Sequence, residues 1–456
     1  MDKDTRSPPL VTWYGDDFTG SAAVMEVLAF SGIETVLFTK VPDATLLARF
    51  GSCQAIGIAS TARSHGPTWM AEHLPAPLRF LDGLGAPLLH YKVCSTGDSA
   101  RDVGSIGTAI EIGLSIRQSK AAPMVVAAPQ MRRWQAFGHL FAGTFDGVFR
   151  LDRHPVMAQH PVTPMDESDL LRHLSTQTKL PSALIDLEAL WSDPQKRLDA
   201  ALASGARILS LDSMDERSEM AVGRLLWENR GRLGFVVGSQ GVEYALVRYW
   251  RTIGLAAPPE VQSGAGRVDR IAAISGSVSP ITATQLRWAE AHGFALIAFS
   301  AATVCLGDDR LAEEENRVTG LACEAASRGQ SPLVHSAIGR EGEAVDDFRT
   351  AVSASGLSIE AANCKIGEAL GRVLSSVLSR TGLRRAVISG GDTSGHGMRQ
   401  LRLDALTALA PTIPGAALCT AYGESEHDGL QIALKGGQMG SEDFFGRIRD
   451  GGGPRN

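Results

Sequence analysis

Short apolar runs alternate with amphipathic stretches almost from end to end of this chain. Runs typical of strands, such as TVLFTK and AIGIAS, are separated by stretches typical of helices, such as GSAAVMEVLAFSG. Strands that alternate with helices predict parallel sheets with helices on both faces. We therefore expect an α/β fold of two domains, each a largely parallel sheet flanked by helices, with a cleft between them.

One segment interrupts this alternation. The sequence LAAPPEVQSGAGR combines a proline pair with glycine and alanine and has little periodicity, which is typical of a linker. The alternation restarts after it with RIAAISGS. We predict an N-terminal domain of residues 1–255, a linker of residues 256–267 and a C-terminal domain of residues 268–456.

Charge and apolar content argue against several classes of protein. The formal net charge of −6 lacks the basic surplus of a nucleic-acid-binding protein. The polar start MDKDTRSPPL is unlike a signal peptide, and no apolar run approaches the ~18 residues that span a bilayer. The six cysteines are scattered, and His139, His154 and His335 share no ligand spacing, so we expect reduced, mostly buried thiols and no metal site. We predict a cytoplasmic protein without nucleic-acid or membrane partners, and leave a homo-oligomer open.

Three glycine-rich turns in the C-terminal domain share one design. SGSVSP, SGGDTSG and KGGQMG each follow a predicted strand and precede a predicted helix; the second helix is expected to run through HGMRQLRLDALTAL. Glycine lets the backbone approach an anion, and free N–H groups at a helix N-terminus favour phosphate. One such turn usually only reverses the chain, but three predict a phosphate-binding edge, because ligands of open sheets bind beyond the strands' carboxyl ends.

Most of the residues expected at this edge are small, and two of them, Asp392 and Lys435, are charged. Ser279 is expected to cap the helix after the first turn, and Lys435 either adds a point charge for phosphate or is simply solvated. The predicted nucleotide-binding residues are Ser275, Gly276, Ser277, Gly390, Gly391, Asp392, Thr393, Lys435, Gly436 and Gly437.

Polar clusters also follow the strands of the N-terminal domain. YGDDFTGS places Asp16, Asp17 and Thr19 after the first strand. Paired carboxylates suit sugar hydroxyls or a metal, and one can act as a general base; alternatively, Asp17 or Thr19 only caps the following helix. Arg63, after a later strand, can hold a carboxylate through two N–H bonds or lie at the surface.

Two further segments are polar enough to contact a sugar acid. The loop YKVCSTGDSAR contains Lys92, Asp98 and Ser99, although a polar loop alone is weak evidence. In QHPVTPMD, His160 can reach a ligand, but a structural histidine is the more common case.

These clusters, in this order, resemble the four-carbon acid sugar kinase family. The matching pieces are YGDDFTGS, the loop beginning YK, HPVTPM, SGSVSP, ISGGDTSG and LKGGQMG, which span nearly the whole chain. The resemblance implies an N-terminal sugar-acid domain and a C-terminal ATP domain. It implies that the sugar acid faces Asp16, Asp17, Thr19, Arg63 and Lys92, and that the nucleotide faces Ser275, Ser277, residues 390–393 and Gly437. Known members phosphorylate a terminal hydroxyl of substrates such as threonate, erythronate or 3-oxo-tetronate.

The chain departs from the family pattern in the third substrate loop. Many members carry K-x-D-S-T-x-R-G-N there, whereas this chain has Cys94 at the aspartate position. Arg132 and Arg133 also stand where the family tends to have a proline-rich segment, and they either supply anion contacts or lie at the surface. The substrate therefore stays open among a four-carbon acid, a branched sugar acid and another relative.

Together these features predict an ATP-dependent kinase that phosphorylates a hydroxyl of a small sugar acid, with ATP and Mg²⁺ held by the glycine turns. Arg63, Lys92 and Arg101 are expected to hold the carboxylate, with Ser99 and His160 nearby. Asp17, or otherwise Asp98, is expected to accept the hydroxyl proton. One alternative is a nicotinamide-dependent sugar-acid dehydrogenase, which the missing GxGxxG disfavours. Another is a non-catalytic sugar-acid sensor, which would not need three phosphate turns.

Overall fold

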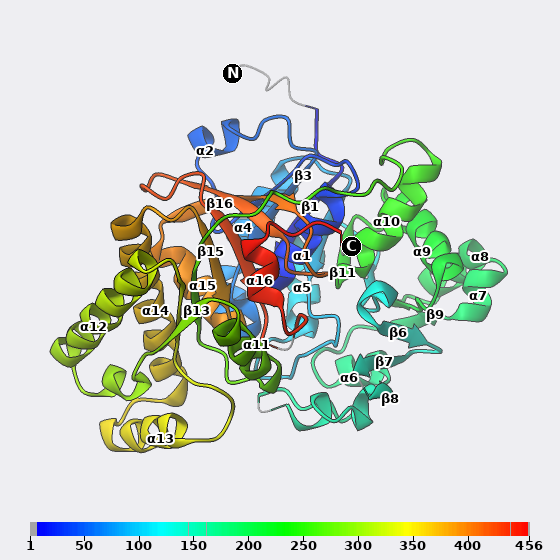
Figure 1. Ribbon diagram of the computed structural model, residues 1–456. Helices are drawn as coiled ribbons and strands as arrows, with labels where there is room; N and C mark the ends of the chain where they lie inside the picture. Colours follow the sequence, from blue (N-terminus) through cyan, green and yellow to red (C-terminus); the bar gives the residue numbers. More distant parts are fainter. Residues whose placement is uncertain (1–6, 145, 161, 438, 455–456) are drawn as a thin grey trace. The chain divides into compact units, whose positions relative to one another are not determined.

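The computed structural model describes residues 7–144, 146–160, 162–437 and 439–454. Pro161 and Gln438, which belong to the HPVTPM and KGGQMG segments, lie outside the described residues, as does the side chain of Asp392. The chain divides into two compact units, Met1–Glu260 and Val261–Asn456, which Figure 1 traces along the sequence.

The first unit is built on a parallel sheet with the strand order β2-β3-β1-β4-β11-β5-β10-β9. Its central strands are buried on both faces, as their nearly continuous apolar sequences predict. The strands are β1 (Val11–Gly15), β2 (Thr35–Phe38), β3 (Ala55–Ala59), β4 (Leu88–Lys92), β5 (Ala122–Val125), β9 (Ser182–Ile185), β10 (Ile208–Leu211) and β11 (Phe235–Gly238).

Side-chain caps define where several helices of this unit begin. Asp17, Ser105, Asp169, Asp186, Asp193 and Asp215 each accept a backbone N–H of the first turn. The helices are α1 (Phe18–Ala29), α2 (Ala44–Ala48), α3 (Pro67–His73), α4 (Pro75–Gly83), α5 (Ile106–Ile116), α6 (Leu170–Ser175), α7 (Leu187–Trp191), α8 (Pro194–Ala203), α9 (Glu216–Glu228) and α10 (Gly241–Thr252). Short 3₁₀ helices are η1 (Ala62–Ser64), η2 (Pro129–Met131), η3 (Leu151–Arg153) and η4 (Met157–Gln159).

A small antiparallel sheet in the first unit was not predicted from the sequence. It consists of β6 (Arg133–Ala136), β7 (His139–Thr144) and β8 (Gly147–Arg150), and Figure 1 shows it close to α6. Arg132 and Phe137 both have left-handed backbone angles, with φ of 57° and 50°. Residues with such backbone angles interrupt the alternation of apolar and polar residues by which strands are recognised in a sequence.

The second unit has the strand order β13-β14-β12-β15-β18-β17-β16. Strands β13, β14, β12, β15 and β18 run parallel to one another. Strand β17 is antiparallel to both β18 and β16. A core cluster including Leu286, Phe294 and Phe444 packs against this sheet. The strands are β12 (Ala272–Ser275), β13 (Phe294–Ala298), β14 (Ser331–His335), β15 (Arg385–Ser389), β16 (Leu403–Ala410), β17 (Leu418–Gly423) and β18 (Gln431–Lys435).

The α-helices of this unit are α11 (Pro280–Ala291), α12 (Asp308–Ser327), α13 (Glu343–Ser355), α14 (Ile359–Thr381), α15 (Gly391–Gln400) and α16 (Phe444–Arg449), and η5 (Ala301–Cys305) is a 3₁₀ helix.

The helix predicted over HGMRQLRLDALTAL is wrong in its second half. Arg402, with a φ of 54°, separates α15 from strand β16. Antiparallel pairing with β17 therefore overrides the helical tendency of this leucine- and alanine-rich segment.

Part of the predicted linker segment is held within the second unit. Ala265 donates its N–H to the carbonyl of Gly451 at 2.8 Å. The buried Arg385 donates from Nη1 to the carbonyls of Gly266 and Ile448, at 2.8 and 3.1 Å. These bonds place Ala265 and Gly266 among the residues of the second unit.

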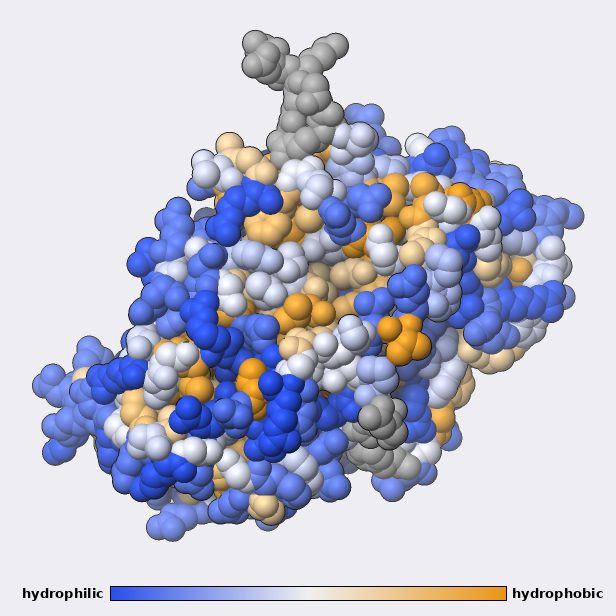
Figure 2. Space-filling model, turned by 45° about the horizontal axis from the view of Figure 1, so that its top comes forward, coloured by the Kyte–Doolittle hydropathy of each residue, from blue (hydrophilic) through white to orange (hydrophobic). Residues whose placement is uncertain are grey.

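The surface carries both polar and apolar residues. The face drawn in Figure 2 is hydrophilic over most of its area, with smaller hydrophobic areas between. Within the part of the chain that the structure describes, no helix combines the length and the apolar character that crossing a membrane requires.

All six cysteines are free, but the expectation that most are buried is wrong, because only Cys419 is buried and the other five are partly exposed.

Candidate active site

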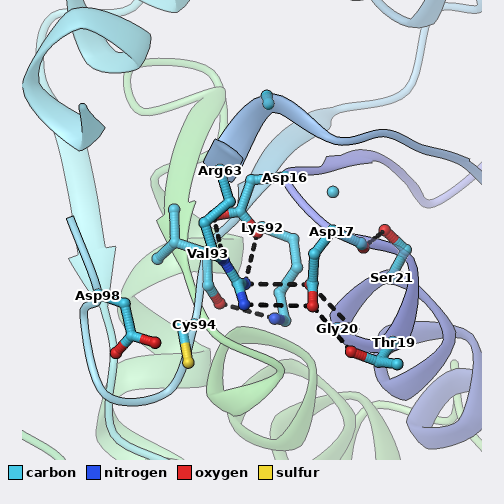
Figure 3. Close-up of polar contacts among 12 residues, drawn as sticks. Asp16, Asp17, Thr19, Gly20, Ser21, Arg63, Lys92, Val93, Cys94 and Asp98 are labelled. Atoms are coloured by element: carbon cyan, nitrogen blue, oxygen red, sulfur yellow. Dashed lines mark hydrogen bonds and ion pairs between the residues drawn. The ribbon is translucent and has the colours of Figure 1, made fainter. Parts of the chain in front are cut away.

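Acidic and cationic side chains meet at one edge of the first unit's sheet. Asp16 and Asp17 follow β1, Arg63 lies in η1 just after β3, and Lys92 ends β4. Strand β1 pairs in parallel with both β3 and β4, so that Gly15 lies opposite Ala59 and Lys92. Because carboxyl ends of parallel strands share an edge, residues far apart in sequence come together there. Figure 3 shows this cluster.

Arg63 holds both aspartates. Its Nε and Nη2 donate to the two carboxylate oxygens of Asp16 at 3.2 and 2.7 Å. Its Nη1 and Nη2 donate to those of Asp17 at 3.1 and 3.0 Å. The Asp16 side chain is 3% exposed, and those of Arg63 and Asp17 are 23% and 20% exposed. A substrate carboxylate would therefore compete with two aspartates for this guanidinium.

Asp17 also caps helix α1, as one of the two alternatives for this residue predicted. Its Oδ1 accepts the N–H of Gly20 at 2.9 Å, and its Oδ2 accepts the hydroxyl of Thr19 at 2.7 Å. Burial alone would raise the pKa of Asp17, but Arg63 and Lys92 outweigh it, and the pKa is lowered. The carboxylate is thus ionised and partly exposed, which leaves a catalytic role open as well.

Asp16 differs from its neighbour in electrostatics. Burial raises the pKa of Asp16, and the negative charge of Asp17 adds to that effect, while Arg63 opposes it. The two adjacent carboxylates therefore have pKa values shifted in opposite directions, a pattern that favours different roles for the two groups.

Lys92 is fully enclosed next to Asp17. It is 1% exposed, and its Nζ donates to the carbonyl of Val93 at 2.6 Å. A Cβ atom on Gly20 would lie 2.5 Å from this Nζ and 2.3 Å from Oδ1 of Asp17. The absence of a side chain at Gly20 therefore allows Lys92 to approach the carboxylate. Gly20 was not among the site residues predicted from the sequence. The only sequence signal for it was its place as the second glycine of the YGDDFTGS motif.

The divergent loop after β4 lies beside this cluster. Oγ1 of Thr96 lies 2.9 Å from Sγ of Cys94 and donates to Oδ1 of Asp98 at 2.5 Å. Burial and the charge of Asp98 raise the pKa of Cys94, against the effect of Arg63 and Lys92. Figure 3 shows Cys94 on the arm of the loop nearer to Arg63 and Lys92, and Asp98 on the opposite arm. This position thus presents a neutral thiol, and the carboxylate of the loop stands four residues later.

Arg133 also faces this loop. Its Nη1 donates to the carbonyls of Met131, Arg132 and Gly143, and its Nε is buried without a hydrogen-bond partner. Burial lowers the pKa of Arg133, and the nearby Cys94 and Asp98 act in the opposite direction. Arg133 is therefore a cation within electrostatic reach of the loop, whereas Arg132 and Arg101 are exposed.

Ser99 and His160, two predicted substrate residues, have bonding partners within the protein. The buried Ser99 hydroxyl donates to the carbonyl of Gly97 at 2.9 Å and lies 2.9 Å from Nε2 of His173. Nδ1 of His160 lies 3.1 Å from the N–H and 3.0 Å from the hydroxyl of Thr163. Both residues stabilise their own loops, and their contact with a substrate stays a prediction.

The three glycine-rich turns of the second unit lie side by side. In the parallel sheet, Ser275 of β12 pairs with Ser389 of β15, and Ser389 pairs with Lys435 of β18. Gly276 donates its N–H to the carbonyl of Ser389 at 3.0 Å, and Gly390 donates to that of Lys435 at 2.8 Å. The structure therefore brings the three predicted phosphate turns to one edge.

Thr282, in the first turn of α11, connects these turns and was missed by the sequence analysis. Its Oγ1 donates to Oγ of Ser277 and to the carbonyl of Gly437, both at 3.1 Å. It also accepts a hydrogen bond from Nζ of Lys435 at 3.2 Å. A threonine three residues into a helix carries no sequence signal for such a role, because its partners lie in other turns.

Glycine is required in these turns for different reasons at different positions. A Cβ on Gly276 would lie 2.3 Å from Oγ1 of Thr393, and one on Gly437 would lie 2.6 Å from Oγ of Ser277. Gly390 has a φ of 131°, which side chains rarely tolerate. A Cβ on Gly391 would meet no atom of the protein within 4 Å. Only at Gly391, among these four, does the protein itself leave the position sterically open.

Unsatisfied polar groups gather at this edge. Oγ of Ser275, Ser279 and Ser389 is buried without a hydrogen-bond partner. Ser279 occupies the N-cap position of α11, but the expectation that it caps is wrong, because its side chain makes no capping bond. Buried polar groups are normally paired, so free hydroxyls at a set of glycine turns indicate a place where a polar ligand binds.

Lys435, the last residue of β18, is fully buried next to the turns. Its Nζ donates to the carbonyl of Gly436 at 3.0 Å. Burial lowers the pKa of Lys435 to about 7, so the amine is only partly charged near neutral pH. A nearby anion such as a phosphate group would favour the charged form of the amine.

Comparison with known proteins agrees with this division of labour. Residues 11–246 match a family model described as a sugar-binding N-terminal domain, and residues 272–445 match one described as a nucleotide-binding C-terminal domain. A Paraburkholderia graminis protein named 3-oxo-isoapionate kinase is 45% identical over 445 residues, which cover 97% of this chain and 94% of that protein. A Cupriavidus necator protein named 3-oxo-tetronate kinase is 29% identical over 452 residues, which cover 96% of this chain and 96% of that protein.

The fold is also known from a crystal structure. A Haemophilus influenzae protein assigned to the family model DUF1537 superposes with a TM-score of 0.69, at 20% sequence identity, over 96% of this chain and 99% of that one. At this level of identity the likeness shows the shared fold alone.

Proposed function

This chain belongs to the four-carbon acid sugar kinase family, and we propose that it is an ATP-dependent kinase that phosphorylates a hydroxyl of a small sugar acid. The observation that carries this proposal is the register of Ser275, Ser389 and Lys435, which aligns three glycine turns at one sheet edge. A sugar-acid sensor would not need such an edge. A nicotinamide-dependent dehydrogenase would need a GxGxxG turn after its first strand, where this chain has YGDDFTGS.

The substrate class follows from the relatives. A protein 45% identical to this chain is named 3-oxo-isoapionate kinase, and one that is 29% identical is named 3-oxo-tetronate kinase. We place 3-oxo-isoapionate first and 3-oxo-tetronate second as substrates. The neutral Cys94 and the cationic Arg133 beside the substrate cluster are the residues on which we expect this choice to depend.

The domain roles follow the same division. We assign residues 1–255 to the sugar-acid domain, residues 256–267 to a linker and residues 268–456 to the nucleotide domain, to which the end of the linker is bonded at Ala265 and Gly266. We propose that the protein is cytoplasmic and draws on cellular ATP. Backbone N–H groups of the turns and the amine of Lys435 would hold the phosphates. Phosphoryl transfer depends chiefly on such positioning and charge neutralisation.

The chemistry of Mg²⁺ fits this arrangement. Mg²⁺ usually keeps several waters and binds through one or two carboxylates together with substrate phosphates. Arg63 and Lys92 together already compensate the charges of Asp16 and Asp17, so we assign Mg²⁺ to the phosphates of ATP and not to a cage of protein ligands. When bound, it would neutralise charge on the transferred phosphoryl group.

The acceptor side would be served by the cluster around Asp17. In the proposed step, the substrate hydroxyl gives its proton to Asp17, its oxygen bonds to the γ-phosphorus, and the bond from that phosphorus to ADP breaks. Asp98 is the second choice as base. Arg63 and Lys92 would hold Asp17 in its ionised form next to the sugar acid. Arg133 would supply the further positive charge that the carboxylate of the sugar acid needs.

Measuring ADP release tests the proposal. The full chain is incubated with ATP and Mg²⁺ and, in turn, 3-oxo-isoapionate, 3-oxo-tetronate, threonate and erythronate. We expect ADP formation that depends on one of the 3-oxo acids. Acid-dependent reduction of NAD would indicate the dehydrogenase, and thermal stabilisation by an acid without turnover or ATP binding would indicate the sensor. Either outcome would overturn the kinase proposal.

A further inference from the structure

A cysteine, a glutamate and a histidine of the second unit converge where α14 and α15 pack together. Cys364 and Glu368 lie one turn apart on α14, and His396 lies on α15. Sγ of Cys364 lies 3.6 Å from Nδ1 of His396 and 3.7 Å from Oε1 of Glu368. The three ligand atoms all lie within 4.8 Å of one another, and the three residues are partly exposed.

These distances match those around a tetrahedral zinc ion. With Zn–S near 2.3 Å and Zn–N or Zn–O near 2.1 Å, tetrahedral geometry separates the sulfur from each other ligand atom by about 3.6 Å. We propose that Cys364, Glu368 and His396 form a binding site for Zn²⁺, with water as the fourth ligand.

The ligand types favour this ion over the Mg²⁺ that accompanies ATP. Thiolate and imidazole are soft or borderline donors that select zinc and related transition metals, whereas Mg²⁺ prefers oxygen donors in octahedral geometry. The sequence concealed the site because Cys364 and His396 are separated by 31 residues and share no recognised ligand spacing.

The packing of the two helices sets the geometry of the site. A Cβ on Gly367 would lie 2.9 Å from Cβ of His396, and one on Gly371 would lie 2.9 Å from Cβ of Gln400. Glycine at these positions allows α15 to lie directly against α14. Because α15 starts at Gly391, a bound ion would hold the two helices together about one and a half turns from the second glycine turn.

Two groups must change state when the ion binds. Nη2 of the exposed Arg399 lies 3.0 Å from Nδ1 of His396, so this arginine must turn toward solvent. The thiol of Cys364 must also lose its proton, because the thiolate is the form that binds the metal. Affinity for the ion should therefore increase with pH.

Metal titration of the full chain without nucleotide tests the site. Zn²⁺ is titrated in competition with a chromophoric chelator, and Co²⁺ serves as a spectroscopic substitute. We expect one tightly bound ion per chain, and a Co²⁺ complex with tetrahedral d–d bands and a thiolate charge-transfer band. Cys364→Ser should abolish the charge-transfer band, and Glu368→Gln and His396→Asn should each weaken Zn²⁺ binding by at least about tenfold.

Controls separate this site from adventitious binding. Cys323→Ser removes another partly exposed helical cysteine, in α12, and should leave the titration unchanged. Circular dichroism establishes that each variant is folded. Equal Zn²⁺ affinity in wild type, Cys364→Ser and His396→Asn would overturn the proposal, as would a wild type that does not compete with the chelator.

Discussion

The guanidinium of Arg63 donates to both carboxylate oxygens of Asp16, from Nε at 3.2 Å and from Nη2 at 2.7 Å. This two-point contact spans 47 residues of sequence and involves a carboxylate that is 3% exposed. Arginine can form such a fork and lysine cannot. The pair is therefore part of the framework of the substrate cluster as well as a source of charge for it.

Removal of this arginine should destabilise the protein. Arg63→Met leaves the buried Asp16 without its cation, and loss of one partner of a buried pair costs about 3 kcal/mol or more. We expect a loss of this size in the free energy of unfolding by urea denaturation. Arg224→Met, which removes an exposed partner of Glu228, should cost less than about 1 kcal/mol. Equal effects of the two substitutions would contradict the framework role.

Asp17→Asn should remove most of kcat and leave ATP affinity nearly unchanged. An amide retains the cap of α1 but cannot accept a proton, and loss of a general base costs about 10²–10⁴-fold. Steady-state kinetics with varied ATP and sugar acid provide the measurement. Asp98→Asn is the matched comparison. Near-normal kcat in Asp17→Asn together with a large loss in Asp98→Asn would move the base to Asp98.

Gly391→Val should raise KM for ATP without unfolding the protein. A Cβ at Gly391 meets no protein atom within 4 Å, so we expect a side chain there to obstruct a ligand without disturbing the fold. Gly276→Val is the contrasting variant, because its Cβ would lie 2.3 Å from Oγ1 of Thr393 and should lower Tm. If a folded Gly391→Val protein has the wild-type KM for ATP, the turn does not contact the nucleotide.

The buried Lys435 should make stability depend on pH. Its pKa is about 7 in the folded protein, against an ordinary value of 10.5. Between these values the unfolded chain binds more protons, so the free energy of unfolding should rise with pH. We expect a rise of about 2 kcal/mol from pH 7 to pH 9 relative to Lys435→Met. The measurement is urea denaturation of both proteins across this range.

The sign of that difference is the decisive result. Lys435→Met has no amine to protonate, so it should be the more stable of the two near pH 7 and lose that advantage as the pH rises. Parallel curves for the two proteins would show that Lys435 has an ordinary pKa in the folded state.

Local sequence patterns were sufficient for the class of fold, the family and the three glycine turns. The runs RIAAI, RRAVI and LQIAL correspond to β12, β15 and β18, because an apolar run followed by glycine marks a buried strand and its end without knowledge of its neighbours. Alternation of strands and helices then predicted parallel sheets correctly. The two-domain α/β fold is confirmed, and the roles of the individual site residues stay predictions.

The partners of each side chain depended on the order in which strands lie in the sheets. Arg63 meets Asp16 because β3 lies next to β1, and Thr282 meets Gly437 because α11 begins beside the turn after β18. Residues 403–410 became a strand because β17 pairs with them, and Cys364 meets His396 because α15 packs on α14. Periodicity and turn residues report local conformation, whereas these contacts join segments that only the folded chain brings within hydrogen-bonding distance.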